Sequence, residues 1–156
     1  MMKFLLPGGD ILSVLAMAQE LIAAGNRAKI NVELLDANVS SKYIEQLLIT
    51  FNPFKTTGHL GIVINSLTIS LEENEFSFFE FLNSEPAYIF FDQDDPQGKS
   101  VVVKIEDAKV AGRVFEDSFG MEYFLSNEQM DYLVAVNWYV IEFAGTAKEK
   151  LAHLIS

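Results

Sequence analysis

The sequence predicts an α+β fold, with N-terminal helices, then a mainly antiparallel β-sheet with short inserted helices, and a C-terminal helix. Apolar residues recur every three or four positions in about the first 50 residues, which is the period of a helix. From about residue 60, short stretches alternate apolar and polar residues between turn residues, as antiparallel strands do. The 156 residues are expected to form a single globular domain, residues 1–156.

Two helices are expected before residue 60. The first begins at Asp10, a good N-cap, and ends at Gly25-Asn26, because glycine adopts the left-handed conformation without steric strain. The second covers Ser41 to Phe51 and is stopped by Pro53. A short strand is expected between them, within residues 30–35.

The middle of the chain is expected to alternate strands with short helices. Asp107 is placed to cap one of these helices, and Gly120 to end it. A turn rich in Asp, Pro and Gly separates two strands that we expect to pair in antiparallel fashion. The expected order is a strand at 67–71, a solvated connection at 72–75, an aromatic-rich helix within 76–82, strands at 87–92 and 101–105, the capped helix, and a strand at 122–125.

Residues 126–138 fit two structures. Ser126 and Gln129 have the spacing of a capping box, which favours a helix. The alternation of Tyr132, Val134 and Val136 instead favours a hairpin, and we prefer the hairpin. A last helix is expected to cover 139–143, to break near Gly145 and to resume through 151–155.

The composition excludes several classes of protein. The net charge of −11 opposes binding to nucleic acid, which needs clustered Lys and Arg. The absence of cysteine removes disulfides, thiolate catalysis and cysteine-based metal sites. Helix breakers and Asp10 interrupt the apolar N-terminal stretch, so we expect no cleaved signal, and no apolar run approaches the ~18 residues of a membrane span. A cytoplasmic protein is expected.

The negative charge is concentrated in one part of the chain. Residues 72–131 contain fifteen acidic and four basic residues, which leaves seven of each elsewhere. Acidic loops often serve only solubility, but packed like charges also destabilise a fold unless a basic partner relieves them. The residues that we expect to bind such a partner are Asp92, Asp94, Asp95, Glu116 and Asp117, followed by Glu72, Glu73 and Glu75.

Catalytic and metal-binding motifs find little support. His59 and His153 have no spacing that would hold zinc, and His59 lies in a turn-like segment typical of a surface histidine. The acidic residues from Asp92 to Asp95 resemble the start of a calcium loop, but the required later glycine and glutamate are missing. Trp138 is either a core anchor or an interface hot spot. We expect no catalytic residue, no cofactor and no metal.

The order of elements in the second half is similar to that of bacterial polymorphic-toxin immunity proteins, and loosely to the SUKH-like class. The similarity covers about residues 85–145 and rests on the strand 87–92, the helix that ends at Phe119-Gly120, and the strands 122–126 and 131–138 with their Asn137-Trp138 pair. It implies a non-catalytic protein that binds and neutralises a cognate toxin, often a basic nuclease.

Three functions therefore remain open. The favoured one is an acidic inhibitor that pairs with Lys and Arg of a basic protein toxin. The second is a small-ligand-binding or enzymatic domain with an aromatic-lined pocket, in which His59 and the tyrosines are the candidate polar groups. The third is a structural or adaptor subunit, because the thirteen phenylalanines would suit a homodimer interface as well as a core.

Overall fold

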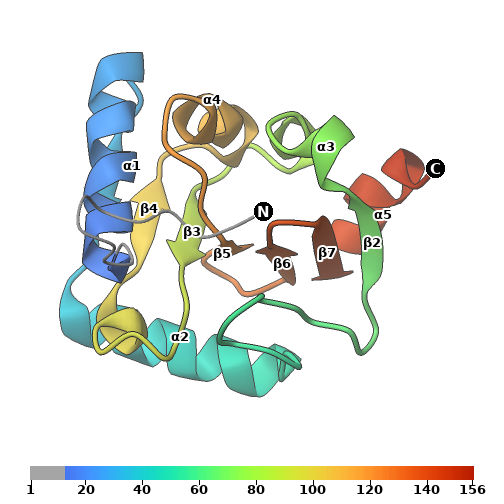
Figure 1. Ribbon diagram of the computed structural model, residues 1–156, viewed down its shortest axis with the longest axis horizontal. Coiled ribbons are helices and arrows are strands. Elements are labelled where there is room, and N and C mark those ends of the chain that lie inside the picture. Colours follow the sequence, from blue (N-terminus) through green and yellow to red (C-terminus); the bar gives the residue numbers. More distant parts are fainter. Residues whose placement is uncertain (1–12) are drawn as a thin grey trace.

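The computed structural model describes residues 13–156 and contains one sheet of seven strands with helices on both faces (Figure 1). The strand order is β1-β4-β3-β5-β6-β7-β2, and every neighbouring pair is antiparallel. The predicted α+β class is confirmed. The strands are β1 (Val32–Leu34), β2 (Leu67–Ser70), β3 (Ala87–Phe90), β4 (Val103–Ile105), β5 (Tyr123–Ser126), β6 (Tyr132–Val136) and β7 (Val140–Gly145).

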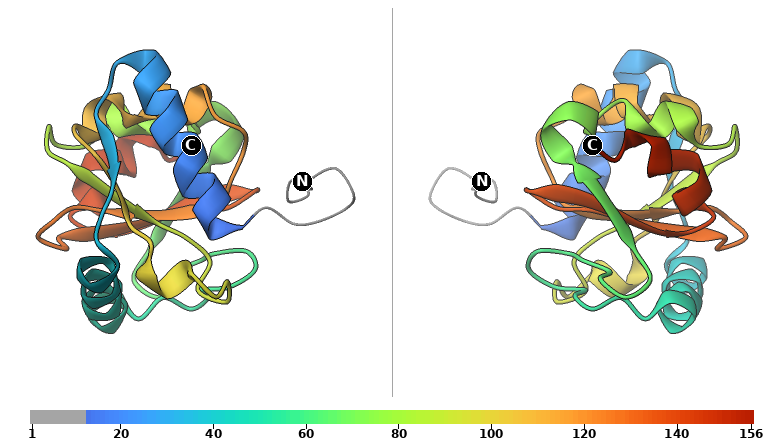
Figure 2. Two further views of the ribbon diagram at one scale, coloured as in Figure 1. Left: turned by 90° about the vertical axis from the view of Figure 1, so that its left-hand side faces the viewer. Right: turned by 90° about the vertical axis from the view of Figure 1, so that its right-hand side faces the viewer.

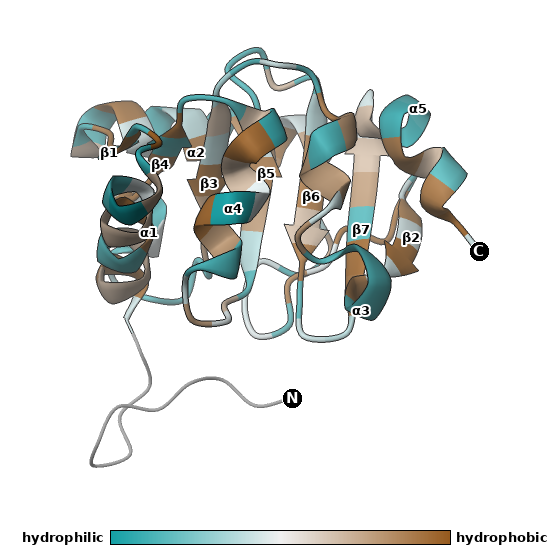
Figure 3. Ribbon diagram, turned by 90° about the horizontal axis from the view of Figure 1, so that it is seen from above, coloured by the Kyte–Doolittle hydropathy of each residue, from teal (hydrophilic) through white to brown (hydrophobic). Residues whose placement is uncertain are grey.

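The helices form a layer on each side of the sheet. One face is covered by α1, α3, α4 and α5, and the opposite face by α2 (Figures 2 and 3). The α-helices are α1 (Val14–Ala28), α2 (Ala37–Phe51), α3 (Leu71–Asn74), α4 (Ala111–Glu116) and α5 (Ala147–Leu151). Short 3-10 helices are η1 (Phe78–Phe81), η2 (Gly98–Ser100), η3 (Ala108–Val110) and η4 (Ala152–Leu154).

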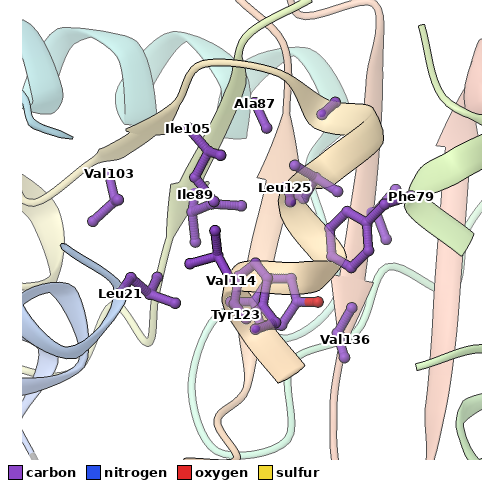
Figure 4. Close-up of a cluster of buried hydrophobic side chains, with 14 of the residues drawn as sticks. Leu21, Phe79, Ala87, Ile89, Val103, Ile105, Val114, Tyr123, Leu125 and Val136 are labelled. Atoms are coloured by element: carbon purple, nitrogen blue, oxygen red, sulfur yellow. The ribbon is translucent and has the colours of Figure 1, made fainter. Parts of the chain in front are cut away.

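Both faces of the central strands are buried. Ala87 and Ile89 of β3 belong to the apolar cluster beneath α1 and α4, part of which is drawn in Figure 4. Tyr88 and Phe90 belong to a second cluster against α2. Burial on both faces explains why these strands are continuous apolar runs instead of showing a strict alternation.

The first helix begins and ends later than predicted. Ser13 is its N-cap, and the Ser13 hydroxyl accepts a hydrogen bond from a backbone N–H of the first turn. The predicted N-cap, Asp10, lies outside the described residues. The helix continues through Gly25-Asn26 and ends at Lys29, which adopts the left-handed conformation with φ 62°. A Cβ at Gly25 would lie 2.4 Å from a β1 side chain, so this glycine allows close packing instead of ending the helix.

The second helix begins at Ala37, earlier than the predicted start at Ser41. The cause is Asp36, whose carboxylate accepts hydrogen bonds from two backbone N–H groups of the first turn at 2.8 and 3.2 Å. The helix ends at Phe51 as predicted, because Asn52 adopts the left-handed conformation directly before Pro53.

The connections of the middle region are more helical than predicted. Residues 72–75 belong largely to α3 instead of a solvated connection, and the aromatic segment forms the 3-10 helix η1. The helix capped by Asp107 consists of η3 followed by α4 and ends at Glu116, before the predicted stop at Gly120. The Ser118 hydroxyl donates a 2.8 Å hydrogen bond to a carbonyl of the last turn, which satisfies one of the groups left free there.

Both predicted hairpins are present. β3 and β4 pair in antiparallel fashion, and β5 and β6 pair with Tyr123 opposite Val136, so the hairpin interpretation of residues 126–138 is confirmed.

The predicted helix at 139–143 is wrong, because these residues form β7 and its preceding turn. The Asn137 side chain accepts hydrogen bonds from the N–H groups of Tyr139 and Val140, at 2.7 and 2.9 Å, and thereby fixes the turn between β6 and β7. Ile141 and Phe143 are buried on either side of the half-buried Glu142. That period of two belongs to a strand.

Candidate partner-binding site

The acidic residues predicted to bind a partner fall into two structural groups. Those of α3 and of the end of α4 adjoin in sequence residues that line one pocket. Those that follow β3 are mostly engaged in holding a loop.

A pocket of about 240 Å³ lies between the segment that follows α3 and the chain that leaves α4. Both helices lie on the same face of the sheet (Figure 3). The lining combines aromatic side chains with one carboxylate and comprises Glu75, Phe76, Phe115, Ser118, Gly120, Met121, Tyr123 and Trp138. Three segments of the chain therefore meet at the pocket. They are residues 75–76, residues 115–123 and the turn between β6 and β7.

The two segments approach each other closely because residue 112 is a glycine. A Cβ at Gly112 would lie 2.1 Å from the Phe76 carbonyl oxygen and 3.2 Å from the Phe79 ring. No side chain larger than hydrogen fits at that distance without movement of the backbone. Gly112 thus sets the position of α4 against the segment that carries Glu75.

Stacked aromatic rings support one wall of the pocket. Phe115 stacks on Tyr123, with ring centroids 4.2 Å apart, and on Phe79, at 5.5 Å. The position of the Phe115 ring is therefore held by two aromatic neighbours. Such packing produces a wall that is formed before any ligand arrives.

Glu75 is half-buried in this apolar surrounding. Burial raises the pKa of the Glu75 carboxyl above its ordinary value, because the charged form loses solvation. Burial also raises the pKa of Tyr123, and the charge of Glu75 adds to that effect. The pocket thus contains one acid among apolar groups, an arrangement that favours a cation.

Further carboxylates adjoin the lining residues of the pocket in sequence. Glu72 and Glu73 are exposed on α3, just before Glu75. Glu116 and Asp117 lie between the lining residues Phe115 and Ser118 in sequence, and both are exposed. Two of the acidic clusters expected from the sequence therefore adjoin, along the chain, residues that line the same pocket.

The acidic cluster that follows β3 forms hydrogen bonds within the fold. The Asp92 carboxylate accepts hydrogen bonds from the N–H groups of Gly58 and Asp94, at 2.9 and 2.8 Å. The Asp95 carboxylate accepts them from Val14 and Gln97, at 3.1 and 2.9 Å. Asp95 thereby binds the N-terminal end of α1, where the helix dipole favours a negative charge. Asp94 is exposed.

The clusters do not all converge. Asp95 contacts the first residue of α1, Val14, whereas Asp117 forms an ion pair of 2.7 Å with Arg27 in the last turn of the same helix. Val14 and Arg27 are thirteen positions apart on the helix, a rise of about 20 Å. The pocket-flanking acids and the loop acids are therefore distinct surfaces.

His59 lies elsewhere, and its partner was not predicted from the sequence. The His59 ring, 47% exposed, has its Nδ1 2.9 Å from Glu122 Oε2, and the buried Glu122 also accepts a hydrogen bond from the Leu60 N–H. Asn137 donates to the Leu60 carbonyl at 3.0 Å. These contacts hold the loop that follows α2 against the end of the sheet, and His59 is not among the residues that line the pocket.

Several pocket residues were not singled out as site residues from the sequence. Phe76, Phe115 and Tyr123 were assigned to predicted helices or strands, and they had a binding role only in the general expectation of an aromatic-lined pocket with tyrosines among its polar groups. The signal in the sequence was that an aromatic residue directly adjoins an acidic cluster twice, at Glu75-Phe76 and at Phe115-Glu116. Trp138, which we considered as an anchor or a hot spot, is 7% exposed and lines the pocket.

Comparison with protein families, with curated proteins and with solved structures finds no match for this chain. Within residues 13–156, none of the helices has both the length and the apolar character that a bilayer crossing requires. The site is that of an α+β protein with an aromatic pocket bordered by carboxylates.

Proposed function

We propose that this protein is a non-catalytic, cytoplasmic inhibitor of the immunity type, which binds and neutralises a basic protein toxin. One observation carries the proposal. The exposed residues Glu72, Glu73 and Glu116 adjoin in sequence the lining residues of a preformed aromatic pocket that itself contains Glu75. An acidic rim around an aromatic centre is the arrangement expected of a surface that binds a basic protein.

The charge of this surface has a kinetic consequence. Grouped carboxylates raise the local concentration of a cationic partner and increase the association rate by 10-fold or more at low ionic strength. Exposed charges are screened over about 8 Å at physiological salt, so the effect falls as salt is added. The aromatic pocket contributes burial, which mainly lowers the dissociation rate.

The test uses the product of the neighbouring reading frame as the candidate toxin. We expect the protein to relieve the toxicity of that product in a bacterial host and to bind it in solution. The variant Glu72→Lys/Glu116→Lys should reduce the association rate by about 10-fold at low salt and flatten its salt dependence.

The matched control is Glu33→Lys/Glu45→Lys. It makes the same change in net charge at two exposed residues of β1 and α2, away from the pocket. The association rate of this control should fall much less than that of Glu72→Lys/Glu116→Lys. Equal losses in the two variants would show that only total charge matters, and an absence of binding and of rescue would refute the proposal.

The pocket supports a second candidate, a small-ligand-binding domain. Its aromatic lining, with Glu75 and Tyr123, meets the requirement for polar groups in an apolar pocket. Of the expected polar groups, Tyr123 lines the pocket and His59 does not. A small organic cation that binds with higher affinity than any basic protein would favour this candidate.

A further inference from the structure

The pocket beside Glu75 has the chemistry of a receptor for one long cationic side chain. Among its eight lining residues, all in the described part of the chain, Glu75 is the only charged one. Phe76, Phe115, Tyr123 and Trp138 supply apolar surface. Lysine and arginine combine a methylene stem, which prefers apolar walls, with a charged head, which needs an anion.

The size of the pocket favours a single side chain over a complete metabolite. Its volume is about 240 Å³, below the roughly 300–1,000 Å³ typical of small-molecule sites. Pockets that receive one anchor residue are a common feature at the centre of protein interfaces, where arginine is enriched.

The surroundings of the pocket also favour a cation delivered by a protein. Glu72, Glu73 and Glu116 are exposed, lie within three residues of Glu75 or next to Phe115 in sequence, and contribute negative charge outside the pocket itself. A free small cation would use only Glu75, whereas a basic protein surface would meet the rim and the pocket together. The rim and the pocket therefore fit one occupant.

We propose that this pocket receives a lysine or arginine side chain of the basic partner, with the Glu75 carboxylate as its counter-ion and the aromatic walls around its stem. The inference rests on the proposed function and specifies how the partner is anchored. Glu75 is then a specificity-determining residue, because a neutral side chain of the same length would leave its carboxylate buried without a partner.

Trp138 provides the readout, since it lines the pocket and is the single tryptophan of the chain. The probes are the peptides acetyl-Gly-Lys-Gly-amide and acetyl-Gly-Arg-Gly-amide, with acetyl-Gly-norleucine-Gly-amide as the neutral control of equal stem length. We expect a saturable change in Trp138 fluorescence, with dissociation constants in about the millimolar range. At least one cationic peptide should bind five-fold or more tightly than the norleucine peptide.

The decisive variant is Glu75→Gln, which keeps the shape of the side chain and removes its charge. It should abolish the preference for the cationic peptides. Glu45→Gln, on an exposed site of α2 across the sheet, should retain it. Far-UV circular dichroism checks that both variants fold. The preference of the wild-type protein for the cationic peptides over the norleucine peptide is a test that needs no variant.

Three results would overturn the inference. The first is equal affinity for all three peptides, or no saturable change in fluorescence. The second is a cation preference that survives Glu75→Gln. The third is binding of n-butylammonium without binding of the peptides, which would indicate that the pocket takes a free small cation. These failures can be told apart from a failure of the proposed function. If Glu72→Lys/Glu116→Lys slows association with the toxin but Glu75→Gln leaves its dissociation rate unchanged, only the pocket inference fails.

Discussion

Gly112→Ala tests whether the position of α4 is set by contact with the segment that carries the pocket. Helix propensity alone predicts that alanine stabilises α4 by about 1 kcal/mol over glycine. The structure predicts instead that Gly112→Ala destabilises the protein. The new Cβ would lie 2.1 Å from the Phe76 carbonyl oxygen and 3.2 Å from the Phe79 ring.

The magnitude follows from the movement required. A carbon atom needs a separation of more than 3 Å from that oxygen, so α4 or the Phe76 backbone must move by about 1 Å. The obstacle is a backbone atom next to η1, whose Phe78 and Phe79 are fully buried, and cannot turn aside as a flexible side chain would. Overpacking of this kind destabilises by roughly 1–3 kcal/mol even after relaxation.

Urea unfolding followed by Trp138 fluorescence and by far-UV circular dichroism measures the effect. With a slope of about 2 kcal/mol per molar urea, the midpoint should fall by about 0.5–1.5 M. Gln46→Ala, at an exposed site of α2, is the control for helix propensity and should change the midpoint only slightly, in the stabilising direction. An unchanged or higher midpoint for Gly112→Ala would refute the close packing of α4.

Two further predictions concern buried polar groups. Asn137→Ala should destabilise the protein by about 2–4 kcal/mol, because two turn N–H groups and the Leu60 carbonyl lose a partner. If the free energy of unfolding in urea falls by less than about 1 kcal/mol, water replaces the amide. Glu75→Gln should raise the unfolding midpoint at pH 7. Burial raises the pKa of Glu75 in the folded state, so its ionised form opposes folding at neutral pH, and this penalty is relieved as the pH falls through the folded-state pKa. The wild-type midpoint should therefore approach that of Glu75→Gln as the pH is lowered, and a gap that widens on acidification would contradict this assignment.

The elements predicted correctly are those whose local pattern agrees with their tertiary environment. The β3–β4 pair surrounds a turn rich in Asp, Pro and Gly, and β6 combines β-branched and aromatic residues with burial on both faces. β7 was missed because Tyr139, Ile141 and Phe143 were assigned to a helix, although their spacing of two also fits a strand. The turn that makes it a strand depends on the Asn137 side chain, and no periodicity reports that contact.

The pocket could be predicted only in part. Glu75 and its neighbouring acids were recognisable from their clustering, and Trp138 from its residue type. Their meeting with Phe115 and Tyr123 depends on how closely α4 packs on the preceding segment, which is decided at Gly112. The separate use of Asp95 at the N-terminal end of α1 depends equally on a contact between residues 81 positions apart.

The amino-acid sequence was sufficient for the secondary-structure class, for most strand positions and for the location of the excess negative charge along the chain. These properties depend on composition and on patterns within about ten residues. Which carboxylates remain exposed at a common surface, and which are used to hold loops, was decided only by the packing of the layers. Charge along a chain is one-dimensional, whereas a binding surface is formed by residues that the fold brings together from distant segments.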